Sequence, residues 1–202
     1  MKKIKWVVSD YGGVIAKKQN KQIIARICQL IGISTEDFDP LYRKERDSYD
    51  AGLMDRETYW RHLLSSINKD IGSIDMNTIF DLDIKGWLDI NKETTDYLSS
   101  IKPKVNLALL SNMPKDILPD IHKQTWYKLF DISILSCEEK ICKPDNRIYD
   151  LLLTRIQSEA QYVLFIDDLI LNVKAARQNG INAIQFIDCT SMKKEIEENY
   201  FF

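Results

Sequence analysis

The sequence predicts an α/β fold, a three-layer, Rossmann-like parallel sheet with a set of helices inserted after its first strand. Two observations lead to this prediction. From about residue 91 onward, short apolar runs alternate with segments of helical periodicity, which is typical of parallel sheets covered by helices. Residues 17–90 instead contain helices and loops but no convincing strand, although an apolar strand precedes them. The 202 residues suffice for one medium domain with an insert.

The first strand ends at an acidic residue. The apolar run at 6–8 leads into Asp10, and Gly12 and Gly13 follow. Ligands of open α/β sheets bind beyond the carboxyl ends of the strands, so Asp10 is well placed for chemistry. The two glycines leave the backbone free to curl around an anion. Taken alone, however, an Asp before a glycine turn is more often a turn or cap residue.

Helical spacing organises the next part of the chain. Apolar residues predict a helix at 20–31, ended by Gly32, and a second at 55–67. Residues 34–37 offer the capping side chains of another helix start. The stretch 41–50 is highly charged and is interrupted by Ala-Gly-Leu. We therefore predict a helical insert.

The remaining chain supplies further strands, with helices between them. We predict a core of residues 1–16 and 91–202, and an insert of residues 17–90. In order, the core elements after the insert are a helix at 92–101, a strand at 105–110, a helical or irregular segment at 115–130, a strand at 132–135, a helix with Pro144 in its first turn, a strand at 162–166, a helix at 170–179, a strand at 182–187 and a terminal helix at 193–198.

Three predicted strands end in polar residues, and a lysine precedes a helix between the last two. These residues are Asp10, then Ser111 and Asn112, then Lys143, then Asp167 and Asp168. If the strands are parallel neighbours, the groups meet at one sheet edge, where three carboxylates would repel one another without a cation. Oxygen ligands without His or Cys favour Mg²⁺. Ser111, Asn112 and Lys143 offer donors and positive charge for a phosphate group. An Asp in such a setting can act as a covalent nucleophile in phosphoryl transfer.

The order of these motifs resembles the haloacid dehalogenase (HAD) superfamily. The motifs are Asp10-x-Gly-Gly-Val-Ile, Leu109-Leu110-Ser111-Asn112, Lys143-Pro144 and Phe165-Ile166-Asp167-Asp168 with Asn172. The resemblance covers nearly the whole chain, because the helical insert lies where that superfamily has its helical cap. It looks closest to the branch of α-D-glucose-1-phosphate phosphatases and the N-terminal phosphatase domain of soluble epoxide hydrolase, to which the phrase at 51–60 is similar. It also implies cap closure, with hinges near 16–18 and 87–91.

The resemblance implies a nucleophile and a metal site. Asp10 would form an aspartyl-phosphate and also bind Mg²⁺. The backbone carbonyl of Gly12 would be a second metal ligand. Asp168 would bind the metal directly, and Asp167 directly or through water.

The resemblance also implies the phosphate-binding groups. Ser111 and the backbone of Asn112 would bind the transferring phosphoryl group, and Lys143 would neutralise that group and Asp10. Asn172 would order the loop of the two aspartates. Four residues of the charged cap stretch could reach the leaving group of the substrate, although such a face is usually only solvated: Tyr42, Arg43, Arg46 and Tyr49.

One position departs from the pattern. Phosphatases of this superfamily usually carry a second Asp two residues after the nucleophile, which acts as general acid and then as base, and here that residue is Gly12. General acid–base catalysis contributes about 10²–10⁴-fold. We therefore expect substrates whose leaving groups depart easily, such as anomeric sugar, aryl or acyl phosphates, unless water or another group handles the proton.

We predict a Mg²⁺-dependent phosphatase of small phosphorylated metabolites, for example sugar phosphates. One alternative is a 2-haloacid dehalogenase, which shares the nucleophilic Asp and the Lys, but which uses no Mg²⁺ and lacks the adjacent Asp pair. A second is a HAD-fold protein that binds phosphate or a partner and turns over poorly, and Gly12 keeps it open. A two-component receiver domain has its acidic pair before the phosphoacceptor, which is the reverse of the order here.

Composition excludes other classes of function. A net charge of −2 gives no reason to expect nucleic acid or an anionic membrane as partner. No apolar run approaches the roughly 20 residues of a membrane span, and the N-terminus does not resemble a signal peptide. The four cysteines lack metal-ligand spacing, which favours reduced thiols in a cytoplasmic protein. We expect a monomer or homodimer whose partner is a small-molecule phosphate ester.

Overall fold

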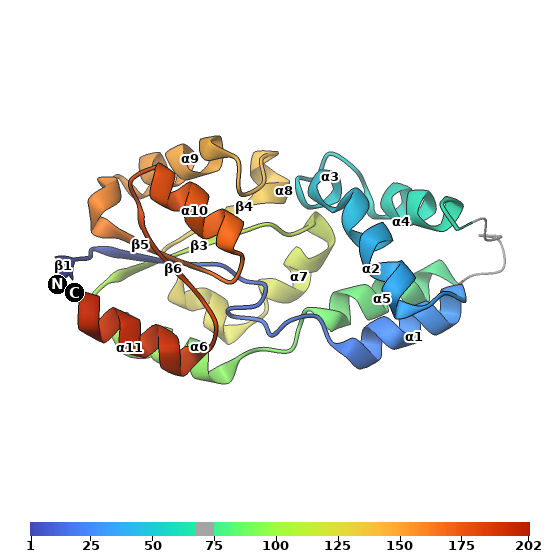
Figure 1. Cartoon of the computed structure of the whole chain (residues 1–202), viewed down its shortest axis with the longest axis horizontal. Helices are drawn as coiled ribbons and strands as arrows, with labels where there is room; N and C mark the ends of the chain where they lie inside the picture. Colours follow the sequence, from blue (N-terminus) through green and yellow to red (C-terminus); the bar gives the residue numbers. More distant parts are fainter. Residues whose placement is uncertain (68–74) are drawn as a thin grey trace.

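The computed structural model describes residues 1–67 and 75–202, and its centre is a five-stranded parallel sheet (Figure 1). The strand order is β4-β3-β2-β5-β6, and every neighbouring pair is parallel. The strands are β2 (Trp6–Ser9), β3 (Asn106–Ser111), β4 (Ile132–Leu135), β5 (Val163–Asp167) and β6 (Asn182–Gln185). The first long strand of the sequence is therefore the central strand. The predicted fold class is confirmed.

Helices cover both faces of the sheet, which explains why its strands are mostly apolar. Figure 1 shows α9 (Asn146–Ile156) and α10 (Ile170–Gln178) on one face, and α6 (Lys92–Ile101) and α11 (Cys189–Asn199) on the other. Along β2, Val7 packs into the apolar cluster that contains residues of α6 and α11, whereas Val8 packs into the cluster with α9 and α10. Successive side chains of a strand point to opposite faces of the sheet, so β2 contributes to two separate apolar cores.

The insert after β2 consists of helices in the described residues. They are α1 (Lys21–Ile31), α2 (Thr35–Lys44), α3 (Arg46–Asp50), α4 (Arg56–Ser65) and α5 (Met76–Gly86). These helices bury an apolar cluster of their own, which includes Phe38, Tyr59 and Trp60. Helix α1 starts one residue after its predicted start, because the Asn20 side chain caps its first turn, and it ends before Gly32 as predicted, with Gly32 at φ +69°. The extent of the insert, 17–90, stays a prediction, and its residues 68–74 lie outside the described part.

Some elements differ from their predicted bounds. Pro144 lies before α9 rather than in its first turn, because Asp145 is the N-cap and its side chain accepts a hydrogen bond from Arg147 N at 2.9 Å. The last strand of the sheet ends at Gln185 because Asp188 already caps α11, which is longer than the predicted terminal helix. The segment 115–130 divides into short pieces, namely 3₁₀ turns at Lys115–Ile117 and Thr125–Leu129 around α7 (Leu118–Ile121), and α8 (Ser136–Glu139) follows β4.

One pairing was not predicted. The two-residue strands β1 (Lys2–Lys3) and β7 (Tyr200–Phe201) form a separate parallel pair that brings the two termini together (Figure 1). Strands of two residues are too short to show a periodicity from which they could be predicted. Within residues 1–67 and 75–202, no helix has the length and apolar character needed to cross a membrane.

Candidate active site

The carboxyl ends of three adjacent strands meet at the edge of the sheet that faces the insert. Asp10 directly follows the central strand β2, while Ser111 ends β3 and Asp167 ends β5. The strand register places Ser9 opposite Leu109 on one side and Ile166 on the other. The structure therefore gathers these predicted site residues as the parallel topology requires.

Lys143 lies at the centre of the site. Its Nζ is 2.8 Å from Asp10 Oδ1 and 2.7 Å from Asp167 Oδ2, and it donates to the carbonyl oxygen of Leu110 at 2.9 Å. Only 1% of its side chain is exposed. Burial lowers the pKa of Lys143, but Asp10 and Asp167 together raise it above its ordinary value. The ammonium group is therefore charged and fixed between two carboxylates.

Asp10 is a buried carboxylate with one free oxygen. Its Oδ1 accepts the backbone N–H of Tyr11 at 2.6 Å and faces Lys143, while Oδ2 has no hydrogen-bond partner in the described part of the chain. Burial raises the pKa of Asp10 to about 7, against the lowering effect of Lys143. A further positive charge beside Oδ2 would stabilise the ionised, nucleophilic form.

Asp167 is fully buried and is held at both of its oxygens. Asn172 donates from Nδ2 to Oδ1 and Oδ2, each at 3.0 Å, and Leu169 N donates to Oδ1 at 2.8 Å. Together with Lys143, these donors occupy the carboxylate. Asn172 thus fixes the turn between β5 and α10, and Asp168 offers the less engaged carboxylate of the pair.

Three carboxylates converge as a divalent cation would need. Oxygen atoms of Asp10, Asp167 and Asp168 all lie within 4.8 Å of one another. Burial and the neighbouring Asp167 raise the pKa of Asp168, which a cation would reverse. Gly13 allows this approach, because a Cβ there would lie 2.4 Å from Asp168 Oδ2. The donors are all oxygen, which fits Mg²⁺.

The side chain of Asn112 holds the backbone of Lys143, in the loop before α9 that we call the lysine loop. Its Nδ2 donates to the carbonyl oxygen of Lys143, and its Oδ1 accepts the Lys143 N–H, both at 2.8 Å. Ser111 is buried, and within residues 1–67 and 75–202 its hydroxyl makes only a long 3.4 Å contact with Asn112 O. The Ser111 hydroxyl and the Asn112 backbone N–H therefore stay available for a phosphoryl group, while the amide side chain aligns Lys143. The alignment of Lys143 by the Asn112 side chain was not predicted from the sequence, because the two residues are 31 positions apart.

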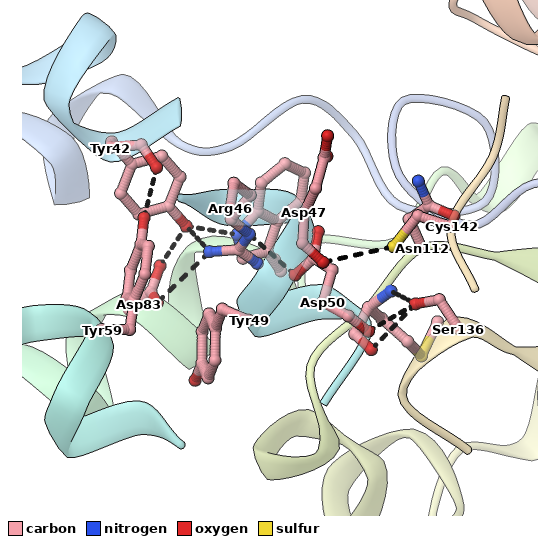
Figure 2. Close-up of polar contacts among 12 residues, drawn as sticks. Tyr42, Arg46, Asp47, Tyr49, Asp50, Tyr59, Asp83, Asn112, Ser136 and Cys142 are labelled. Atoms are coloured by element: carbon pink, nitrogen blue, oxygen red, sulfur yellow. Dashed lines mark hydrogen bonds and ion pairs between the residues drawn. The ribbon is translucent and has the colours of Figure 1, made fainter. Parts of the chain in front are cut away.

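The helical insert closes over this edge of the sheet. Tyr49 OH donates to Asp116 Oδ2 at 3.1 Å, and Ser136 Oγ donates to the carbonyl oxygen of Asp50 at 2.6 Å. Lys140 Nζ donates to Gly52 O at 2.8 Å. These contacts join α3 and the loop after it to the core, as Figure 2 shows for Asp50 and Ser136.

The four cap residues considered as leaving-group contacts divide into two kinds. Tyr42, Arg46 and Tyr49 lie in a mostly buried cluster around the guanidinium group (Figure 2), whereas Arg43 is exposed and pairs with Asp39 at 3.0 Å. Trp87, by contrast, lies beside the loop that follows Asp10, because a Cβ on Gly12 would be 3.4 Å from its ring. The sequence carried no signal for Trp87 beyond its place in the predicted hinge at 87–91.

Known proteins resemble this chain in sequence. The sequence model of haloacid dehalogenase-like hydrolases matches residues 4–180. The chain is 36% identical over 109 residues to acyl-CoA dehydrogenase family member 10 of Mus musculus, covering 51% of this chain and 10% of that protein. It is 35% identical over 69 residues to bifunctional epoxide hydrolase 2 of Sus scrofa, covering 34% and 12%. It is 29% identical over 118 residues to sesquiterpene phosphatase astK of Aspergillus oryzae, covering 56% and 59%. The chain thus spans only part of the length of each of these relatives.

Solved structures share the fold. A HAD family enzyme of Bacteroides thetaiotaomicron matches with a TM-score of 0.76 at 21% identity, covering 91% of this chain and 94% of that one. The same enzyme in complex with magnesium and inorganic phosphate matches with a TM-score of 0.74. A predicted HAD-like family hydrolase of Porphyromonas gingivalis matches with a TM-score of 0.75 at 24% identity, covering 97% and 99%.

Proposed function

Because the chain belongs to the haloacid dehalogenase-like hydrolases, we propose that it is a Mg²⁺-dependent phosphatase of small phosphorylated metabolites that acts through an aspartyl-phosphate on Asp10. The observation that carries the proposal is the placement of Lys143 between Asp10 and Asp167, with Asp168 beside them. This arrangement leaves one oxygen of the buried Asp10 free next to a fixed positive charge. Such a group suits attack on phosphorus.

The carboxylate cluster supports a magnesium site. Asp10, Asp168 and the carbonyl of Gly12 would be direct ligands, and Asp167 would act through water because its oxygens already accept from Lys143, Asn172 and Leu169. When bound, the ion would supply positive charge to the phosphoryl group and orient it.

The residues of the chain divide the remaining work. Asp10 attacks phosphorus through Oδ2, and the bond from phosphorus to the leaving oxygen breaks, so that oxygen departs with the bonding electrons and takes a proton from water. The Ser111 hydroxyl and the Asn112 backbone N–H bind the phosphoryl oxygens during the transfer. Water then attacks the aspartyl-phosphate, which releases phosphate and restores the Asp10 carboxylate. Lys143 keeps its charge throughout.

Gly12 supports a preference for easily departing leaving groups, because it offers no side chain to protonate them. Glucose 1-phosphate, an anomeric phosphate, should therefore have a higher kcat/KM than glucose 6-phosphate. A clear preference for the 6-phosphate would contradict this part of the proposal.

Further parts of the proposal concern the whole protein. Residues 17–90 would act as a cap that opens on hinges near 16–18 and 87–91. The protein would be a cytoplasmic monomer or homodimer, in agreement with its four free cysteines.

Two other functions give different results in the same assay. The Asp167–Asp168 pair favours phosphoryl chemistry over a dehalogenase, which would release halide from a chloroacid without Mg²⁺. A binding protein would fold and bind Mg²⁺ but hydrolyse no ester. The test is Mg²⁺-dependent hydrolysis of a panel of phosphate esters, with Asp10→Asn as the control. We expect turnover that requires both the metal and Asp10.

A further inference from the structure

The indole of Trp87 lies against the residue two positions after the nucleophile. A Cβ on Gly12 would lie 3.4 Å from Cζ3 and 4.0 Å from Cε3 of Trp87, and the described chain places no other non-neighbouring atom within 4 Å of it. Unlike Gly13, Gly12 does not have a positive φ. Its backbone is therefore not in the left-handed region that favours glycine, and the neighbour that a side chain there would meet is the indole ring.

Trp87 follows directly after α5 and is held at three places. Tyr11 OH donates to the carbonyl oxygen of Trp87 at 2.6 Å, which ties it to the residue beside Asp10. The indole Nε1 donates to Tyr42 OH at 3.3 Å, and the guanidinium carbon of Arg46 lies 6.0 Å from the ring centroid. The ring is thus fixed from the core and from the insert.

The insert side of this support is a buried polar network (Figure 2). Tyr42 OH donates to Asp83 Oδ1 at 2.6 Å, and nitrogens of Gln19 and Arg46 also lie within hydrogen-bond distance of the same Tyr42 oxygen. Arg46 Nε lies 2.8 Å from Asp50 Oδ1, and its Nη1 lies 3.7 Å from Asp83 Oδ2. The Tyr42 hydroxyl, which holds Trp87, is therefore contacted by Gln19 before α1, by Arg46 of α3 and by Asp83 of α5.

Few groups around Asp10 could give a proton to a leaving group. Lys143 is committed to two carboxylates, and both oxygens of Asp167 accept hydrogen bonds. The hydroxyl proton of Tyr11 is used on Trp87 O. At Gly12 itself the nearest described side chain is the indole of Trp87, which carries no acidic proton.

We propose that the indole of Trp87 prevents a residue at position 12 from serving as general acid, an inference that rests on the proposed phosphatase function. A Cβ at position 12 would already be in van der Waals contact with the ring, so a longer side chain there would have to pass the indole to reach the leaving group. The site therefore hydrolyses phosphates whose leaving oxygen departs as an anion, with the electrons of the broken P–O bond, and is protonated afterwards by water. Aryl, acyl and anomeric phosphates belong to this class, whereas ordinary alkyl phosphates do not. Tyr42 and Arg46 are positioning residues that act through Trp87.

The test restores a proton donor with and without the ring. The enzymes are the wild type, Gly12→Asp, Trp87→Leu and the double variant Gly12→Asp with Trp87→Leu. The measurement is kcat/KM in saturating Mg²⁺ for a series of aryl phosphates of increasing leaving-group pKa, and for glucose 6-phosphate. We expect a steep decline with leaving-group pKa in the wild type, in Trp87→Leu and in Gly12→Asp. The double variant should show a flatter decline, with glucose 6-phosphate hydrolysed about 10²–10⁴-fold faster than by Gly12→Asp.

Two results would overturn the inference. In the first, Gly12→Asp alone weakens the dependence of kcat/KM on leaving-group pKa as much as the double variant does, which would mean that the ring does not obstruct the aspartate. In the second, the dependence in the double variant is as steep as in Gly12→Asp. The matched control is Gly12→Asp with Trp6→Leu, which removes a tryptophan from the opposite end of β2 and should behave like Gly12→Asp.

Two further measurements separate the possible failures. If Trp87→Leu does not fold by circular dichroism, Gly12→Asp with Tyr42→Phe removes the hydroxyl that holds the indole N–H, and it should flatten the series in part. An unchanged slope there would count against the inference. If the wild type hydrolyses no aryl phosphate in an Asp10-dependent way, the proposed function itself is wrong, whereas Asp10-dependent turnover with an unaltered slope refutes only the role of Trp87.

Discussion

The side chain of Asn112 and the backbone of Lys143 exchange two hydrogen bonds, each 2.8 Å long. The lysine loop is thereby aligned with the end of β3, and the ammonium group is aligned with Asp10. We expect Asn112→Ala to lower kcat about 10²-fold, because a shift of about 1 Å in a catalytic group costs that much. Steady-state kinetics would measure it, with the exposed Asn199→Ala as control. An unchanged kcat would show that Lys143 needs no such alignment.

Position 13 requires glycine for two reasons, its positive φ and the close approach of Asp168. Position 180 shares only the positive φ. Both residues have a similar positive φ, +74° and +76°, but a Cβ on Gly13 would lie 2.4 Å from Asp168 Oδ2, whereas one on Gly180 would meet only Ala160 Cβ at 3.5 Å. We expect both alanine variants to lose roughly 1 kcal/mol or more of folding stability. Gly13→Ala alone should also weaken Mg²⁺ binding at least 10-fold by isothermal titration calorimetry. Equal Mg²⁺ affinity in both variants would contradict the proposed role of Asp168.

The metal-free protein should lose stability as the pH rises from about 4 to about 7. Burial raises the pKa of Asp10 to about 7, so the folded state holds a proton that the unfolded state, with a pKa of 3.8, has already released. By linkage the folded state binds more protons in this window, and its stability therefore falls with rising pH. Asp10→Asn removes this contribution. Its stability relative to the wild type should increase by roughly 2–4 kcal/mol between pH 4 and pH 7.5 in urea unfolding with EDTA. Curves of stability against pH that run parallel for the two proteins would argue against a raised pKa of Asp10.

Magnesium should stabilise the protein at neutral pH. Binding to the folded state alone adds about 2.7 kcal/mol when the free metal is 100 times its Kd. We expect Asp168→Asn to reduce this gain strongly, because it removes a carboxylate from the cluster of three. Asp81→Asn changes an exposed acid of α5 and should retain the full gain. Thermal unfolding with and without Mg²⁺ measures both, and an equal response in the two variants would locate the metal elsewhere.

Ser136 joins the core to the insert through one buried hydroxyl. It accepts from Met113 N at 2.9 Å and donates to Asp50 O at 2.6 Å. We expect Ser136→Ala to destabilise the protein by about 1–3 kcal/mol, because the buried N–H of Met113 loses its acceptor. The exposed Ser65→Ala should change stability by less than about 0.5 kcal/mol. Chemical denaturation measures the difference, and a neutral Ser136→Ala would mean that water replaces the hydroxyl.

The sequence predicts the strand ends of this site but not the loops around them. Asp10, Ser111 and Asp167 could be located because apolar runs mark buried strands, and parallel strands bring their carboxyl ends to one edge. The contacts of Asn112 with Lys143 and of Trp87 with Gly12 join residues 31 and 75 positions apart. Such contacts depend on how loops fold over the sheet, which hydrophobic periodicity does not describe.

The sequence predicts the helices of the insert but not how their side chains pack together. The apolar spacing of α1 and α4 predicts helices, yet Tyr42, Asp50 and Asp83 form a buried polar network that pattern alone reads as a solvated surface. Charged residues are normally exposed, and only the tertiary partners of Arg46 reveal why these are not.

The position of β2, β3 and β5 as the three inner strands of the sheet has an evolutionary consequence. The reacting groups stand at the ends of buried inner strands, whereas Trp87 and the network that holds it belong to a segment inserted between two of those strands. New substrates could therefore be acquired by varying the insert while the reacting groups stay in place. A directed-evolution library confined to residues 40–50 and 83–88 should yield altered specificities at a higher rate than one of equal size in the core.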